Sequence, residues 1–200
     1  MSGAAGLGRY ARVRMRRDQA ILDAALALFS ESGFAGVGVD AIGARAGVAG
    51  PAIYAHFSGK HELLATLIDQ AMDRLLSLTA GAPEDPREEL ELLVRGHVRF
   101  ALEDRALLSV YAQEARALRD DDRRRARRRQ RAYVARWIDV LGRCYPDSGE
   151  ADRGIAAHGT IGMIQSVVHW PSALLATPGV DETLERTALG ALATLAGAPV

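Results

Sequence analysis

Residues 38–64 constrain the fold of this chain more than any other segment. They read GVDAIGARAGVAGPAIYAHFSGKHELL. The pattern predicts a short helix over 39–46, a turn at Gly47, a second short helix over 51–57 and a longer helix that starts at Lys60. Glycine suits the turn because a residue without Cβ adopts positive φ at low cost. Two short helices around such a turn are typical of a helix-turn-helix.

The second short helix is predicted to have an inward and an outward face. Ile53 and Phe57 are four residues apart, so both are expected to point into the core. The residues left to face outward are Gly50, Ala52, Tyr54, Ala55 and His56. The second helix of a helix-turn-helix enters the major groove of duplex DNA with its N-terminal residues. The sequence therefore predicts double-stranded DNA as a partner.

The whole chain is predicted to be all-α, with about nine helices and no strand. Ile21, Ala25, Leu28 and Phe29 recur on one face of a first helix, which is predicted to end at Ser32-Gly33. Beyond the first four helices, the apolar period predicts helices over 86–103, 105–118, 120–143, 150–170 and 181–196. Asp85 can cap the helix at 86, with Pro86 at its first position and Glu88 three residues after the cap. The segment 81–86, GAPEDP, is the clearest break in the helical pattern.

Charge and composition narrow the class of protein. The net charge is zero, but residues 1–17 carry five arginines and no acid, and local charge sets the field that a phosphate backbone feels. The single cysteine, Cys144, excludes an internal disulfide framework and favours a reducing cytoplasm. No apolar run approaches the ~20 residues of a membrane span, and no signal peptide is expected. We therefore expect a cytoplasmic protein without a membrane partner.

Residues 46–64 read AGVAGPAIYAHFSGKHELL. This resembles the recognition helix and the following helix of TetR-family transcriptional regulators, whose usual pattern is A-G-V-S-x-G-x-L-Y-x-H-F-x-x-K-x-x-L. In that family the tyrosine, histidine and lysine contact DNA phosphates, which implies the same role for Tyr54, His56 and Lys60. The full set of expected DNA-binding residues is Arg14, Arg16, Arg17, Val39, Ala49, Gly50, Pro51, Ala52, Tyr54, His56 and Lys60.

The chain departs from the family pattern in ways that affect DNA recognition. Ala49 replaces the usual serine and Pro51 the usual glycine, while Val37 and Gly38 stand where threonines commonly cap the second helix. Losing such a cap costs about 1 kcal/mol. The outward positions Gly50, Ala52 and Ala55 lack long hydrogen-bonding groups, so direct base readout is expected to be poor. Sequence preference should then depend on main-chain contacts, thymine methyls and DNA shape, with minor-groove contacts from the N-terminal arginines.

The resemblance also implies a domain organisation. Residues 1–15 are expected to form a flexible basic arm, 16–62 a helix-turn-helix domain, and 63–200 a ligand-binding and dimerisation domain.

The expected ligand-binding residues are polar and aromatic residues among apolar helix positions, and any one of them could instead be ordinary core. They are Phe100, Leu108, Tyr111, Glu114, Tyr133, Trp137, Met163 and Trp170.

Small and apolar residues on two C-terminal helices suggest a packing seam. A glycine inside a helix costs about 1 kcal/mol relative to alanine, so repeated glycines suggest that another element approaches closely. We expect a four-helix dimer seam, and an internal seam within one subunit is the alternative. The residues concerned are Gly159, Gly162, Ser166, Leu184, Ala188, Leu192 and Leu195.

Residues 120–131 read DDDRRRARRRQR. Three acids at a helix start with arginines behind them suit the helix dipole and i,i+4 pairing, which favours a solvated, self-paired face. An anion site for coenzyme A phosphates and a second DNA surface are the alternatives. The segment Tyr111-x-x-Glu114, followed by this helix and by Trp137-Ile138-Asp139-Val140-Leu141, resembles TetR-family regulators that respond to acyl-CoA thioesters.

Together these expectations predict that the protein is a homodimeric repressor, which a small-molecule effector releases from a palindromic operator. A ligand-independent architectural DNA-binding protein is the alternative. We expect no enzyme and no cofactor, because the sequence has no glycine-rich phosphate loop and no nucleophile elbow. His56 and His61 lack a carboxylate or cysteine at metal-ligand spacing, so no metal site is expected.

Overall fold

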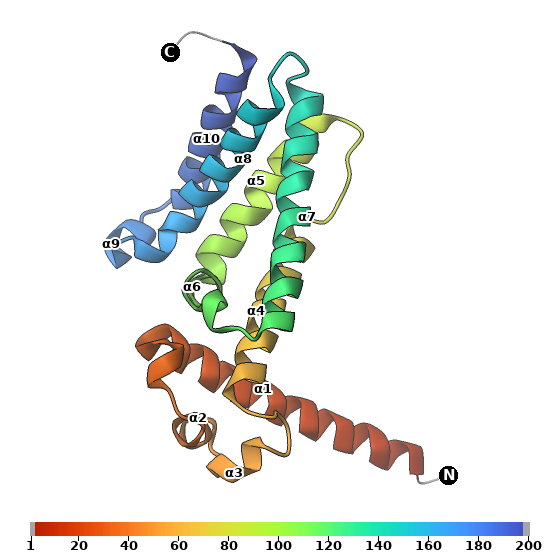
Figure 1. Ribbon diagram of the computed structural model, residues 1–200, viewed down its shortest axis with the longest axis vertical. Helices are drawn as coiled ribbons and strands as arrows, with labels where there is room; N and C mark the ends of the chain where they lie inside the picture. Colours follow the sequence, from red (N-terminus) through yellow and green to blue (C-terminus); the bar gives the residue numbers. More distant parts are fainter. Residues whose placement is uncertain (1–2, 198–200) are drawn as a thin grey trace. The chain divides into compact units, whose positions relative to one another are not determined.

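The computed structural model describes the backbone of residues 3–197 and the side chains of residues 14–197. Within that range the chain has ten α-helices, three short 3-10 helices and no strand (Figure 1). The all-α prediction is confirmed. The helix beyond the nine expected is α9 (Ser172–Leu175), a single turn after Pro171, in a segment that the sequence pattern left as a connection.

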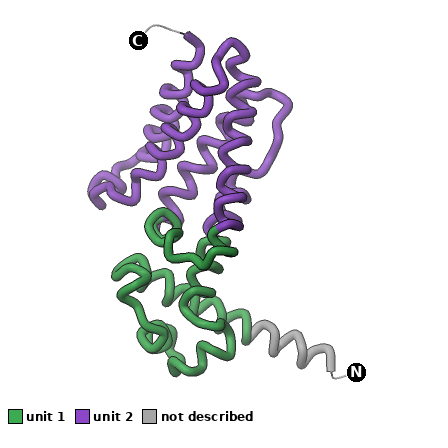
Figure 2. The backbone as a smooth tube through the Cα atoms, in the orientation of Figure 1, with its two compact units in different colours: residues 1–69, 109–123 green, residues 70–108, 124–200 purple. Residues whose placement is uncertain are grey.

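The chain forms two compact units (Figure 2). One contains residues 1–69 and 109–123, and the other contains residues 70–108 and 124–200. The boundary that we predicted after residue 62 lies inside helix α4 (Lys60–Leu78). Residues 109–123, which the sequence placed with the C-terminal part, group with the N-terminal unit.

The N-terminal unit begins with α1 (Gly3–Gly36), α2 (Val39–Ala46) and α3 (Gly50–Ile53). Helix α1 takes in most of the segment predicted as a flexible arm, of which residues 1 and 2 lie outside the described residues. The predicted end of this helix near Gly33 is a kink, because Gly33 has φ 71° and ψ 157° and the helix resumes to Gly36. Ile21, Ala25 and Phe29 form its buried stripe, as the period predicts, while Leu28 of the same predicted face is half-buried.

The next helices follow the predicted ranges closely. They are α5 (Pro86–Glu103), α6 (Arg105–Glu114) with the 3-10 turn η1 (Ala115–Ala117), and α7 (Asp120–Cys144). Asp85 caps α5 as predicted, because its carboxylate accepts the backbone N–H of Arg87 at 2.8 Å. A cap of this kind satisfies one of the free N–H groups at a helix start, so the helix begins sharply.

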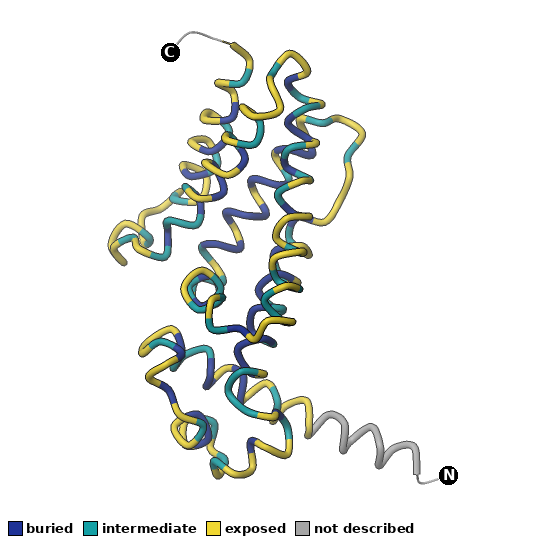
Figure 3. The backbone as a smooth tube through the Cα atoms, in the orientation of Figure 1, coloured by how far each residue is buried: buried dark blue, intermediate teal, exposed yellow. Residues whose placement is uncertain are grey.

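The C-terminal helices are α8 (Glu150–Gln165) with η2 (Ser166–His169), α9, and α10 (Val180–Ala193) with η3 (Thr194–Ala196). Helices α5, α8 and α10 pack against one another in the C-terminal unit. Figure 3 shows the buried stripe along α5, which contains Leu93, Val94 and Val98. No helix among the described residues is both long enough and apolar enough to cross a membrane.

A buried ion pair joins α5 to α7 inside this unit. The Glu89 carboxylate is almost fully buried and binds the guanidinium groups of Arg136 and Arg143. Burial acts to raise the pKa of Glu89, but the hydrogen bonds and charges of the two arginines outweigh it and lower that pKa. Arg136 also donates to the carbonyl of Thr79 at 2.7 Å, so it caps the end of α4.

Candidate DNA-binding surface

The turn between α2 and α3 is built as the sequence predicts. Gly47 has φ 70° and ψ 30°, the left-handed conformation, and its N–H bonds back to the carbonyls of the last turn of α2. Val48 N–H then donates to the Gly43 carbonyl at 2.9 Å. These bonds satisfy the carbonyls at the helix end and fix the angle at which the chain enters α3.

A second glycine, Gly43, allows α2 and α3 to approach each other closely. A Cβ at Gly43 would lie 2.9 Å from Cα and N of Gly50 and from O of Val48. A Cβ at Gly50 would in turn overlap the Asp40 carboxylate and lie 3.2 Å from the Asp40 Cα. Gly50 was predicted as a DNA contact, and the structure gives it a packing role as well. Gly43 was not among the residues predicted from the sequence, although a glycine in the middle of a short helix was a signal for it.

The third helix has the two faces predicted for it but is shorter. It is α-helical only over Gly50–Ile53, and hydrogen-bonded turns continue it to Phe57, whose N–H donates to the Ile53 carbonyl at 2.9 Å. Ile53 and Phe57 are buried, while the Tyr54 side chain is 60% exposed. Ala49, Pro51, Ala52 and Ala55 are also exposed. The outward face is therefore a small-residue surface with one tyrosine at its edge.

The helix starts lack the side-chain caps that the family pattern provides, as expected. The N-cap residues of α2 and α3 are Gly38 and Ala49, and neither makes a side-chain cap hydrogen bond. Their free N–H groups carry partial positive charge that a phosphate could satisfy. Val39, predicted as a DNA contact, is the half-buried first residue of α2.

Lys60 is held more firmly within the N-terminal unit than the sequence indicated. Its Nζ donates to the carbonyls of Phe34 at 3.0 Å and Val37 at 3.1 Å. It also lies 4.4 Å from the centroid of the Phe34 ring, in cation–π geometry. An ammonium group has three donors, so one N–H remains for a further acceptor. Lys60 thus caps the end of α1 in addition to its expected role toward DNA.

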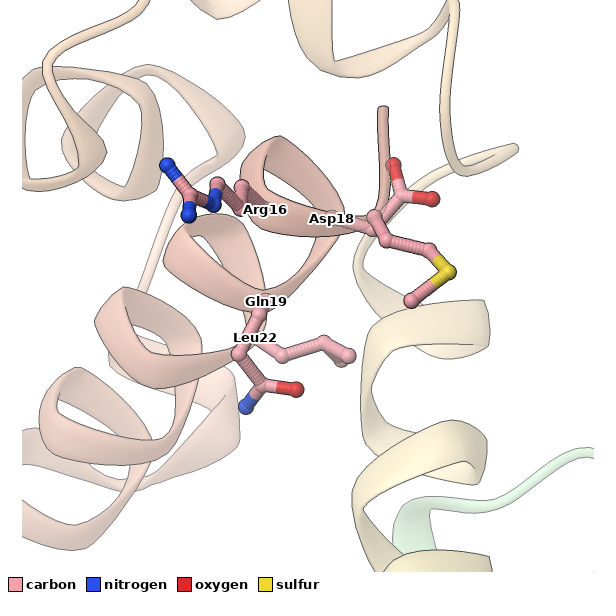
Figure 4. Close-up of a pocket in the computed structure, with 5 residues that line it drawn as sticks. Arg16, Asp18, Gln19 and Leu22 are labelled. Atoms are coloured by element: carbon pink, nitrogen blue, oxygen red, sulfur yellow. The ribbon is translucent and has the colours of Figure 1, made fainter. Parts of the chain in front are cut away.

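His56 is paired with a carboxylate on α1. Its Nδ1 lies 2.5 Å from Oδ1 of Asp18. Asp18 and Arg16 leave α1 on opposite sides, beside a shallow hollow that Gln19 and Leu22 also line (Figure 4). The predicted contacts Arg14, Arg16 and Arg17 are all exposed on this helix. The sequence pattern gave no sign of the pair between Asp18 and His56, because 38 residues separate them.

The predicted ligand-binding residues are distributed over both units. Phe100, Leu108, Tyr133 and Trp137 are buried in the C-terminal unit, where Met163 and Trp170 are half-buried. Tyr111 and Glu114 belong to the N-terminal unit. The Glu114 carboxylate accepts the backbone N–H of Phe34 at 3.0 Å, so it has a structural partner that the sequence did not indicate.

Two of the predicted ligand-binding residues, Tyr133 and Trp137, belong to a buried polar cluster. Nδ1 of His97 lies 2.9 Å from the Tyr133 hydroxyl, and the ring of Trp137 packs edge-on against the His97 ring with centroids 6.1 Å apart. Burial lowers the pKa of His97 to about 3, so its imidazole is neutral. His97 Nε2 and Trp137 Nε1 are buried and have no hydrogen-bond partner among the described residues. Such unsatisfied groups are rare in native cores, and the sequence analysis missed His97.

The residues predicted for a dimer seam divide into two groups. Leu184, Ala188 and Leu192 are buried within the chain, where α10 packs on α5 and α8. Gly159 and Gly162 are exposed, and Leu195 and Ser166 are half-buried. Helices α8 and α10 together line a surface hollow that includes Gly159, Leu195 and Ile155. Ile155, which the sequence analysis missed, is 72% exposed.

The arginine-rich start of α7 is partly self-paired. Arg123 pairs with Asp120 one turn before it, and Arg129 pairs with Asp73 of α4. The described residues contain no group of three or more histidine, cysteine, aspartate or glutamate side chains placed to hold a metal ion.

Comparison with known proteins agrees with this architecture. The model of "Bacterial regulatory proteins, tetR family" matches residues 21–67, and that of a "Tetracyclin repressor-like, C-terminal domain" matches residues 83–173. A curated relative, the HTH-type transcriptional activator FasR of Mycolicibacterium smegmatis, is 36% identical over 92 residues. That match covers 44% of this chain and 42% of FasR.

Two solved structures show the same fold. The TetR-family regulator PfmR from Thermus thermophilus has a TM-score of 0.75 at 22% identity, over 86% of this chain and 96% of its own. AibR, crystallised with isovaleryl coenzyme A and operator DNA, has a TM-score of 0.74 at 20% identity, over 89% of this chain and 97% of its own. The two family models cover both the helix-turn-helix and the helices after it, and the chain belongs to the TetR family of bacterial transcriptional regulators.

Proposed function

We propose that this regulator is a repressor that binds a palindromic operator through α3 and the helix starts around it. One observation carries the proposal: Ile53 and Phe57 anchor the recognition segment inward, while Tyr54 and the small residues beside it stay exposed. The backbone of α3 can then approach a duplex closely. Exposed arginines on α1 supply the positive charge that a phosphate backbone attracts.

Recognition is proposed to depend on shape and main-chain contacts more than on bidentate side chains. The exposed positions Ala49, Pro51 and Ala52 offer only methyl and ring carbons, which suit thymine methyl groups. Phosphate contacts from Tyr54 and the free N–H groups at the start of α2 would fix the register. Few base-edge hydrogen bonds predict a modest cost for single substitutions in the operator.

We propose that two copies pair through α8 and α10. A Cβ at Gly159 or Gly162 would meet no atom within 4 Å among the described residues, apart from the chain neighbours and nearby backbone of its own helix. The close approach that these glycines allow therefore remains available to a second copy. The exposed Ile155 beside them is an apolar side chain for such an interface to bury. A two-fold dimer matches an operator with two related half-sites.

The effector is proposed to act on the C-terminal unit near Tyr133 and Trp137. His97 Nε2 and Trp137 Nε1 lack partners there, and a ligand with a hydrogen-bonding group would satisfy them. An acyl-CoA thioester is the proposed class, since AibR was crystallised with isovaleryl coenzyme A. A typical coupling of about 1–3 kcal/mol between effector and operator gives roughly 5–150-fold changes in affinity.

The proposal is tested by selecting duplexes from a random-sequence pool with the purified protein. A repressor should enrich a palindromic sequence, and isovaleryl-CoA or palmitoyl-CoA should weaken its binding by about fivefold or more, while free coenzyme A should not. A reporter gene behind that sequence should be expressed more strongly when the protein is deleted. Selection without any enriched sequence, and no effect of either thioester, would support the architectural alternative instead.

A further inference from the structure

The pair between Asp18 and His56 determines what the histidine can offer to DNA. Nδ1 of His56 lies 2.5 Å from the Asp18 carboxylate, and the two side chains, His56 and Asp18, are 12% and 32% exposed. The other ring nitrogen, Nε2, has no partner among the described residues and is not one of the polar atoms buried without a partner. It therefore remains accessible to a group outside the N-terminal unit.

The chemistry of imidazole makes this arrangement depend on protonation. An ionised carboxylate only accepts hydrogen bonds, so Asp18 requires the proton on Nδ1. In neutral His56, Nε2 is then an acceptor, which a phosphate oxygen would repel. In the imidazolium form both nitrogens donate, and His56 can bridge the Asp18 carboxylate and a phosphate.

We propose that Asp18 is a positioning residue for DNA binding, which orients His56 so that the protein takes up one proton when His56 Nε2 contacts a backbone phosphate. The inference rests on the proposed DNA-binding surface. The carboxylate stabilises the imidazolium form in both states, and the phosphate adds to this only in the complex. The complex therefore binds the proton more tightly than the free protein does. DNA affinity therefore rises as the pH falls from about 8 to 6, by at most about tenfold per pH unit for one proton.

The other charged side chains on α1 include Arg14, Arg16 and Arg17, and those on α2 and α4 include Asp40, Arg45, Lys60 and Glu62. Free arginine, lysine and carboxylate side chains keep their charge between about pH 6 and 8. His61 is the other histidine of this unit, and its ring packs edge-on against Phe34 with centroids 5.0 Å apart. His61 therefore provides the matched control.

The experiment measures the affinity for the selected operator duplex and for a random-sequence duplex by fluorescence anisotropy at pH 6, 7 and 8. The proteins are the wild type and the variants Asp18→Asn, His56→Gln and His61→Gln. We expect the wild type and His61→Gln to bind more tightly as the pH falls. We expect His56→Gln to show little pH dependence, and Asp18→Asn to show a shallower one with weaker binding at pH 6.

The outcomes separate this inference from the proposed function. If the wild type binds neither duplex at any pH, the DNA-binding surface itself is wrong. If it binds, but His56→Gln or Asp18→Asn keeps the full pH dependence, the positioning role is wrong. Should a variant unfold, the ¹⁵N chemical shifts of the His56 ring in the wild type decide the matter. They should report imidazolium at pH 7.5 with DNA bound, and a neutral ring in that complex contradicts the inference.

Discussion

Glu114 accepts the backbone N–H of Phe34 at 3.0 Å, across 80 residues of chain. The kink at Gly33 interrupts α1 just before Phe34, and the carboxylate binds the N–H at that point. The carbonyl of the same Phe34 accepts from Lys60 Nζ. Both the N–H and the carbonyl of Phe34, near the end of α1, are therefore hydrogen-bonded, the first to a residue of α6 and the second to the first residue of α4.

This contact predicts a structural role for Glu114. Replacing it by alanine should leave the Phe34 N–H without its partner and lower the free energy of unfolding by about 1–2 kcal/mol. Glu114→Gln, which keeps an acceptor oxygen, should lose less. Urea unfolding without ligand measures both. If Glu114→Ala is as stable as the wild type but loses thioester binding, Glu114 is a ligand residue, as the sequence suggested.

The close approach of α2 and α3 predicts that Gly43 tolerates no side chain. In Gly43→Ala the new Cβ would meet only backbone atoms at 2.9 Å, and these cannot rotate away. The free energy of unfolding of this variant should be lower by about 1–3 kcal/mol, and the variant should bind operator weakly. Gly36→Ala is the control, because a Cβ there would meet no other described residue within 4 Å. Equal thermal midpoints for the two variants would contradict the packing argument.

The buried His97 predicts a pH dependence of stability. Burial lowers the pKa of His97 to about 3 in the folded protein, whereas an unfolded chain binds that proton near a pH of about 6.5. Below a pH of about 6.5 only the unfolded chain takes up this proton. The free energy of unfolding is therefore highest above that pH and falls by up to about 1.4 kcal/mol per pH unit below it. His97→Gln should show a smaller loss of unfolding free energy between pH 7 and 5. An unchanged slope in this variant would show that His97 does not cause the dependence.

The exposed face of α8 and α10 predicts the residue that controls dimerisation. Ile155→Glu should convert the proposed dimer to a monomer, because a charge would be buried without a partner in the interface. Leu174→Glu on α9 alters a side chain that is 47% exposed and should leave the dimer intact. Sedimentation velocity distinguishes the two species. A monomeric wild type, or a dimeric Ile155→Glu protein, would contradict the proposed interface.

Local signals in the sequence made much of this fold predictable. The helix over 86–103 follows from Asp85 and Pro86, because a cap and a first-turn proline are encoded within a few residues. Gly47 likewise marks the turn between α2 and α3. The inward positions of Ile53 and Phe57 follow from their helical spacing. In each case the residues that determine the local structure lie close together in the sequence.

Contacts between distant segments could not be predicted in this way. Asp18 and His56 are each ordinary surface residues in the local pattern, and only the fold brings them together. Leu184, Ala188 and Leu192 have the same apolar spacing whether α10 packs inside one chain or against a second copy. Periodicity gives the buried face of a helix but not the element that covers it.

The most direct test of the DNA-binding surface is the operator affinity of Tyr54→Ala. The Tyr54 side chain is 60% exposed, so its removal should leave the thermal midpoint unchanged. Loss of the proposed phosphate contact should weaken binding about tenfold, which corresponds to about 1.4 kcal/mol. Leu174→Ala on α9 serves as the control and should bind like the wild type. A folded Tyr54→Ala protein that binds the operator with wild-type affinity would contradict the account.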